Sequence, residues 1–200
     1  MLGSRRMLRR MVDASSYLAA MGKLATGVTV VGASGDGSVG EWTAQTVSAM
    51  CSVSAEPPIL LACVHERSPL VAAVTRGRRF CVSALATHHD HVADTFAGRP
   101  WPGKDRWDFS CGDWTAAPSG SPRLVDPLAW FDCELHDIVR AGTHHVLLGR
   151  VTALDVAGSP GAAVPLLYAD RDYARPARHE PSSFPNFPDA HPANRLGARR

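Results

Sequence analysis

An alternation of apolar and polar residues over Trp130–Val139 constrains the fold more than any other stretch of this 200-residue chain. One side of the stretch carries Phe131, Cys133 and Leu135, whereas the other side carries Asp132, Glu134 and His136. A period of two is typical of a half-buried antiparallel strand. Residues 140–143 then supply a turn, and the apolar run 145–151 follows, with 154–156 as its extension. This pattern predicts an antiparallel hairpin.

Other short apolar or β-branched runs also have the character of strands. They cover residues 27–33, 43–54, 59–64 and 80–85, and residues 165–168 begin one more short element. Short helices are expected over 14–24, capped by Asp13, over 69–77 after the N-cap Ser68, and over 87–98, where Thr87 and Asp90 resemble a capping box. Because strands and helices do not alternate regularly, the sequence predicts a mainly β fold, an antiparallel barrel with short capping helices.

Composition indicates one domain rather than several. A hydrophobic content of 45% in 200 residues is enough for a sizeable core. We expect the domain over residues 13–175, a basic arm over 1–12, and a Pro-rich tail over 176–200.

The glycine-rich segment 35–40 matches the pattern G-x-G-x-x-G, and it follows a strand. A dinucleotide-binding turn also needs a helix that opens on the third glycine. Here Thr43, Thr46 and Val47 favour extended structure instead, so the segment is interpreted as a hairpin tip.

Charge and cysteine content narrow the class of protein. A formal net charge of +2 with dispersed Lys and Arg argues against a nucleic-acid surface. No apolar run approaches membrane-spanning length. Five cysteines without a CxxC pair argue against a disulfide framework or zinc ribbon. A cytoplasmic protein without a membrane segment is therefore expected.

No metal site is predicted. His88, His89 and His91 fall in the first turn of an expected helix, but no carboxylate or cysteine is spaced to complete a set of ligands. We interpret them as an exposed, polar helix start.

The stretch Thr46–Pro58 is rich in small and hydroxyl residues and stops at a double proline. Small side chains let a flat ligand approach the backbone, and hydroxyls can bond its polar edge. From these residues alone, a surface loop is an equally good interpretation.

The helix start at Ser68 lies beside Arg67, which favours an anion site as well as simple capping. Residues 99–122 are rich in Pro, Gly and Trp without a sustained period. They are expected to form a long, partly ordered loop of the kind that often covers a site.

The order of several motifs resembles the flavin reductase family, the FMN-binding split-barrel proteins that supply reduced flavin to two-component monooxygenases. The resemblance covers roughly residues 15–175. The motifs are Ala25–Val31, Thr46–Pro58, Phe80–Leu85, Phe96-Ala97-Gly98, Gly142-Thr143-His144 and Pro165–Tyr168.

The resemblance implies a homodimer of six-stranded antiparallel split β-barrels of Greek-key type, with FMN or FAD near the subunit interface. It implies hydride transfer from NADH, with NADPH less favoured, and delivery of reduced flavin to a partner monooxygenase. His144 would act near the nicotinamide as the catalytic residue. The residues expected to bind the cofactor are Gln45, Thr46, Val47, Ser48, Ser52, Cys63, Val64, Ser68, Ser83 and Tyr168.

Three positions depart from the family's pattern. Thr143 stands where the family usually has Asp, Val47 replaces the usual Ala, and Ser83 replaces the usual Asn. Two other functions therefore remain open, namely a flavin-binding or carrier module without reductase activity and a split-barrel oxidase of a small phosphorylated amine. The oxidase would need a basic cluster for the substrate phosphate, which we do not find in the sequence.

Overall fold

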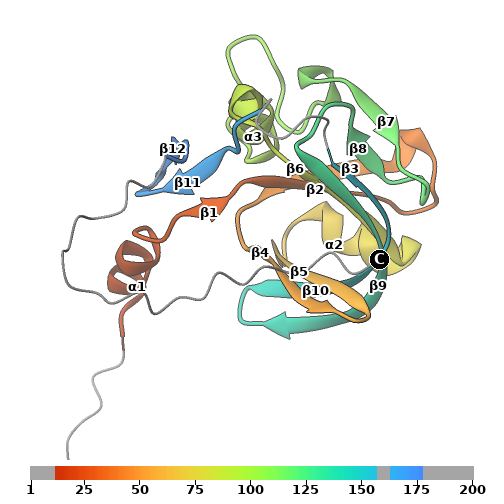
Figure 1. Ribbon diagram of the computed structural model, residues 1–200, viewed down its shortest axis with the longest axis horizontal. Coiled ribbons are helices and arrows are strands. Elements are labelled where there is room, and N and C mark those ends of the chain that lie inside the picture. The colour runs from red at the N-terminus through yellow and green to blue at the C-terminus, as the bar shows by residue number, and fades with distance from the viewer. Residues whose placement is uncertain (1–11, 157–162, 178–200) are drawn as a thin grey trace, which may run out of the picture.

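The computed structural model describes residues 12–156 and 163–177, and it is built around one strongly curved antiparallel sheet (Figure 1). In spatial order its seven strands are β3 (Trp42–Val47), β2 (Thr29–Ser34), β6 (Arg79–Ala84), β9 (Ala129–Ala141), β10 (His144–Val156), β5 (Pro58–His65) and β4 (Met50–Ala55). The mainly β, antiparallel class is confirmed, although this sheet has seven strands where six were expected.

The hairpin predicted from the alternating pattern is the longest among the described residues. Strands β9 and β10 each have 13 residues and pair from His144 opposite Ala141 to Val156 opposite Ala129. The glycine-rich segment 35–40 lies between the antiparallel strands β2 and β3 and contains part of a 3-10 helix, Val39–Glu41. No α-helix opens there, and the hairpin interpretation is confirmed.

The stretch 43–54 does not form one strand. β3 ends at Val47 and β4 begins at Met50, and these two strands occupy opposite edges of the main sheet. The chain crosses from one edge to the other through Ser48 and Ala49, where the carbonyl of Ala49 accepts a hydrogen bond from the amide of Cys63 (3.0 Å). The sheet therefore curls until its edges nearly meet, and the opening between them lies at Ser48.

Two hydrophobic clusters lie on the two sides of β2, which is buried at every position. One includes Val31, Phe80 and Leu147, and α2 (Pro69–Gly77) packs into it through Leu70 and Val74. The other cluster includes Val30 and Phe96, and α3 (Asp90–Phe96) packs there. The two helices thus bind opposite faces of the same strand.

The expected loop over 99–122 is partly regular, so this prediction is wrong in part. It contains a 3-10 helix (Phe109–Cys111) and the strand β7 (Trp114–Ala116), which pairs with β8 (Pro122–Leu124). Aromatic packing explains the order, because the rings of Phe109 and Trp114 both meet Phe96, with centroids 5.0 and 5.3 Å apart.

The capping box predicted from Thr87 and Asp90 is also wrong. The helical segment begins with a 3-10 turn, Thr87–His89, and the ring of His89 takes the capping role. Its Nδ1 accepts a hydrogen bond from the amide of Ala86 (3.2 Å). His89 is only 3% exposed, so the expected exposed, polar helix start is incorrect at this position.

The N-terminal helix α1 (Ala14–Met21) is capped by Asp13 as predicted, and none of its residues is buried. It precedes β1 (Thr26–Gly27), which forms a small sheet with β11 (Leu167–Ala169) and β12 (Asp172–Ala174). Among the residues described, no helix is both long and apolar enough to cross a membrane. The expected arm, apart from Val12, and the expected tail beyond residue 177 lie outside the described residues.

Candidate functional site

Three adjoining cavities form a groove where the chain passes from β3 to β4. Their volumes are about 270, 190 and 560 Å³. The first and second cavities share Ala97, and the second and third share Ser48 and Tyr168. We call this continuous depression the groove and number its cavities in that order.

The first cavity has a cationic and hydrogen-bonding lining. Gln45 comes from β3, and His65, Arg67 and Ser68 come from the end of β5 and the start of α2. Ser68 is held by its capping role, since its hydroxyl accepts a hydrogen bond from the amide of Leu70 (3.3 Å). The sequence Ser68-Pro69 thus places a helix start and a guanidinium at one end of the groove, which suits an anion.

The second cavity lies between β3 and the end of α3. The hydroxyl of Thr46 donates to the carbonyl of Ala93 (2.6 Å) and ties β3 to that helix. Ser48 and Tyr168 line the cavity beside Arg99. The small side chains of Ser48 and Ala97 leave the backbone open to a flat ligand.

Arg99 is fixed by a pair of groups on neighbouring elements. Its guanidinium lies 3.1 Å from Oδ1 of Asp94, which also accepts a hydrogen bond from the hydroxyl of Tyr173 (2.9 Å). Burial and the Asp94 carboxylate raise the pKa of Tyr173, so it stays a neutral donor. The network holds β12 against α3 and keeps a cation at the second cavity.

The third cavity is the largest and the most apolar. Leu18, Met21 and Leu24 line it from the N-terminal helix and the residues after it, opposite Ala49 and Tyr168. The surface beyond it is also apolar, because Tyr17 and Leu18 are more than half exposed.

His144 begins β10 directly opposite His65, the last residue of β5. The two imidazoles meet edge to face with centroids 5.1 Å apart. The hydroxyl of Thr143 lies 3.0 Å from Nδ1 of His144, so this imidazole has a hydrogen-bonding partner in the turn. His144 itself lines none of the three cavities, and it adjoins the first one through His65.

The structure brings together some of the predicted site residues and separates others. Gln45, Thr46, Ser48, Ser68 and Tyr168 line the groove. The side chains of Val47 and Val64 lie in the core, and Ser83 is buried with its hydroxyl accepting from the amide of Leu124. Ser52 and Cys63 lie on the neighbouring strands β4 and β5 outside the three cavities.

Among the groove residues that sequence reasoning missed are His65, Arg99, Trp107 and Tyr173. The expectation that residues 99–122 could cover a site was the only signal for Arg99 and Trp107. Tyr173 carried no signal, because its role depends on Asp94, which is 79 residues away in sequence.

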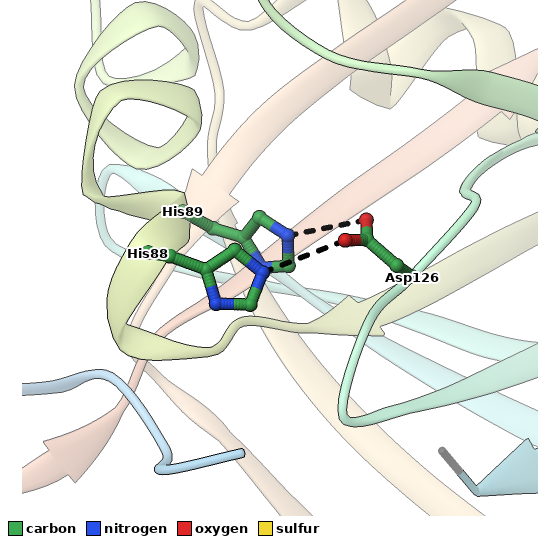
Figure 2. A group of neighbouring side chains, drawn as sticks. All are labelled: His88, His89 and Asp126. Atoms are coloured by element: carbon green, nitrogen blue, oxygen red, sulfur yellow. Dashed lines mark hydrogen bonds and ion pairs between the residues drawn. The ribbon is translucent and has the colours of Figure 1, made fainter. Parts of the chain in front are cut away.

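A second polar cluster lies away from the groove, where His88 and His89 both point at Asp126 (Figure 2). The Nε2 atoms lie 3.5 and 3.2 Å from the two carboxylate oxygens. Asp126 follows His89 by 37 residues, so short-range spacing in the sequence does not reveal it as a partner for these histidines. Because Nδ1 of His89 accepts from Ala86, the proton of the neutral ring is on Nε2 and is donated to Asp126. Nε2 of His89 cannot ligate a metal without losing its hydrogen bond to Asp126. The geometry therefore favours a hydrogen-bonded contact between the two residues over a metal site.

Burial disfavours the thiolate at three of the cysteines, Cys63, Cys81 and Cys133. Cys81 and Cys133 are buried, and burial raises the pKa of both thiols, that of Cys133 to about 12. The more exposed Cys63 also has a raised pKa, because burial and the nearby Cys51 disfavour its thiolate.

The chain's sequence matches the model of the "Flavin reductase like domain" family over residues 21–177. The chain belongs to this family. It is 39% identical over 188 residues to the FMN reductase (NADH) RutF of Methylorubrum extorquens, covering 94% of this chain and 87% of that relative.

Solved structures of the family have the same fold. The NADH:FAD oxidoreductase SgcE6 of Streptomyces globisporus is 28% identical, with a TM-score of 0.71 over 84% of this chain and 98% of that one. BorF, the flavin reductase component of a bacterial two-component tryptophan halogenase, is 31% identical, with a TM-score of 0.70 over 83% and 100% of the two chains.

The groove fits a flavin by the chemistry of its lining. Small residues at Ser48, Ala49 and Ala97 leave room for a flat ring system, and Tyr168 offers an aromatic face. Arg67 and Ser68 supply a cation and a hydroxyl for a phosphate at the other end. These residues are the ones that would hold the cofactor.

Proposed function

We propose that this protein is an NADH-dependent flavin reductase that transfers hydride to FMN or FAD and releases reduced flavin to a partner monooxygenase. The observation that best supports this proposal is a groove with small residues at its centre and a cationic end. The chain that forms it matches the flavin reductase like family over residues 21–177. Relatives named as NADH-dependent FMN reductases support NADH and FMN as the first pair to assay.

The flavin supplies the redox chemistry when it is bound, so the protein needs no nucleophile and base of its own. The backbone and hydroxyls of Thr46 and Ser48 orient the ring system, and Arg67 and Ser68 bind a phosphate of a bound nucleotide. Tyr168 and the loop from Arg99 to Trp107 exclude water from the groove.

His144 serves as the positioning residue for the nicotinamide. Thr143 lies within hydrogen-bonding distance of its Nδ1, and His65 packs against its ring, so its orientation is restricted from two sides. This restraint supports reductase activity over a carrier module, because a carrier has no need of an oriented imidazole beside the groove.

We further propose that the protein is a homodimer and works in the cytosol. A helix of eight residues with none buried is marginal in water by itself, and α1 presents Leu18, Met21 and nearby apolar residues to solvent. A second copy of the chain would cover this face next to the third cavity. The five free cysteines suit a reducing compartment.

The test is to mix the purified protein with FMN or FAD and with NADH or NADPH under anaerobic conditions. Loss of the visible absorbance of oxidised flavin with NADH, at a rate proportional to protein concentration, is the expected result. If no flavin and nucleotide combination is reduced while flavin still binds, the reductase proposal fails and the carrier function is favoured.

A further inference from the structure

Trp107 stands out among the residues that line the first cavity. It is 54% exposed, although tryptophan is usually well covered in a folded protein. Its backbone has φ of 58°, in the left-handed region that bulky residues rarely adopt. An outlier of this kind persists only where the surroundings hold it, and such outliers cluster at ligand sites.

Two contacts with the end of α3 and the residues after it hold Trp107 in this conformation. Its amide donates to the carbonyl of Thr95 (3.2 Å), which anchors the end of the loop on α3. Gly98, with φ of 78°, reverses the chain after α3 and lies against the indole, since a Cβ there would be 3.5 Å from the ring. The conformation thus holds a large aromatic surface at the rim of the cavity.

Cationic and donor groups share this cavity with the indole. Nδ1 of His65 accepts from the amide of Arg67 (3.1 Å), so the neutral ring carries its proton on Nε2 as a donor. The guanidinium of Arg67 has no ion pair within the described part of the chain. An aromatic surface beside an available guanidinium matches a ligand that joins a flat ring to a phosphate.

We propose that the first cavity is an adenosine-phosphate subsite, in which the purine of a dinucleotide stacks on Trp107 and its phosphate meets Arg67. This rests on the proposed function, which requires that nucleotides bind in the groove. A volume of about 270 Å³ is small for a whole dinucleotide, so the cavity takes one end of a ligand that continues into the second cavity. The adenosine can belong to FAD or to NADH, because both carry the same group.

Direct binding to the intact protein tests the subsite without any turnover. AMP and ribose 5-phosphate are titrated by calorimetry, and the purine should tighten binding about 5- to 150-fold, the range of one base–aromatic stack. AMP that binds no more tightly than ribose 5-phosphate overturns the proposal. This comparison uses the unaltered chain and depends on no variant.

Variants then assign the effect to Trp107. Trp107→Leu removes the aromatic surface without adding a β-branch at the left-handed position. This variant should lose most of the difference in affinity between AMP and ribose 5-phosphate, whereas Trp107→Phe should keep part of that difference. Trp101→Leu is the matched control, since Trp101 is 49% exposed on the same loop but packs edge-on to His91 (5.5 Å) outside the cavity. Equal AMP affinity in all three variants and the parent overturns the assignment.

The source of the adenosine is decided by two ratios measured for the parent and Trp107→Leu. A fall in the affinity for FAD relative to FMN assigns the subsite to the flavin. A rise in KM for NADH relative to reduced nicotinamide mononucleotide assigns it to the nicotinamide nucleotide. If neither ratio changes, the subsite is not used by either dinucleotide and the proposal fails, even where the parent reduces flavin. A parent that binds AMP through Trp107 but reduces no flavin would instead contradict the proposed function alone.

Discussion

The imidazoles of His65 and His144 meet edge to face, 5.1 Å between centroids, at paired positions of β5 and β10. His65 lines the first cavity and His144 does not, so the pair connects the groove to a residue just outside it. Strand pairing fixes this relationship, because each histidine is the terminal residue of its strand. The contact gives His144 a defined position relative to the groove.

Replacing His144 with Ala should slow flavin reduction about 10- to 100-fold while FMN still binds, because a misplaced nicotinamide loses near-attack geometry. Stopped-flow reduction by NADH and FMN titration measure the two effects separately. His136→Ala is the control, since His136 is exposed on β9. An unchanged reduction rate in His144→Ala would remove His144 from the mechanism.

A bulky residue at Ser48 should block the centre of the groove. Ser48→Phe is expected to weaken FMN binding about 5- to 150-fold, from the usual 1–3 kcal/mol of overpacking. Equilibrium dialysis or flavin fluorescence measures the loss, and Ser38→Phe at the exposed hairpin tip controls for added aromatic surface. If the Ser48 variant binds FMN as the parent does, the ring system lies elsewhere.

Stability should fall on acidification because of His89. Burial, with help from His88, lowers its pKa below the ordinary value of 6.5, while Asp126 acts in the opposite direction. Below about pH 6.5, His89 is therefore protonated more readily in the unfolded chain than in the folded chain. Proton uptake then favours unfolding, so the stability of the fold decreases as the pH drops. This contribution is fully present above that pH.

The measurement is Tm between about pH 7 and about pH 5. His89→Asn keeps an acceptor for the amide of Ala86 but does not titrate, so its Tm should fall less over this range than that of the parent. His136→Asn controls for the loss of a histidine. Parallel pH profiles for all three proteins would show that His89 is not responsible.

A charge on the apolar face of α1 should disrupt the proposed homodimer. Leu18→Glu is expected to raise the dimer dissociation constant at least about 10-fold, because an interface core excludes an unpaired charge. Ala19→Glu is the control, because it places the same charge about 100° around this exposed helix from Leu18 and away from Met21. Sedimentation equilibrium measures the dimer dissociation constants of both variants. A dimer unaffected by Leu18→Glu would place the interface elsewhere.

The sequence was most informative about local structure. Alternation over 130–139, the Ser68-Pro69 helix start and the Asp13 cap each depend on neighbours within a few residues, and the structure bears out all three. The cap of the helical segment that begins at Thr87 was misassigned, because the ring of His89 accepts the hydrogen bond from the amide of Ala86. This role goes with the burial of His89, which short-range patterns do not reveal.

By itself, the sequence determined the mainly β class, the hairpins and the importance of the stretch from Thr46 to Pro58. Only the tertiary structure decided how that stretch is used. It is divided between the two edges of the sheet, with Ser48 at the opening and Val47 in the core. The tertiary structure also brought Arg99, Trp107 and Tyr173 to the groove. Periodicity records which side of a strand is buried, whereas curvature and long-range pairing determine which buried sides face one another.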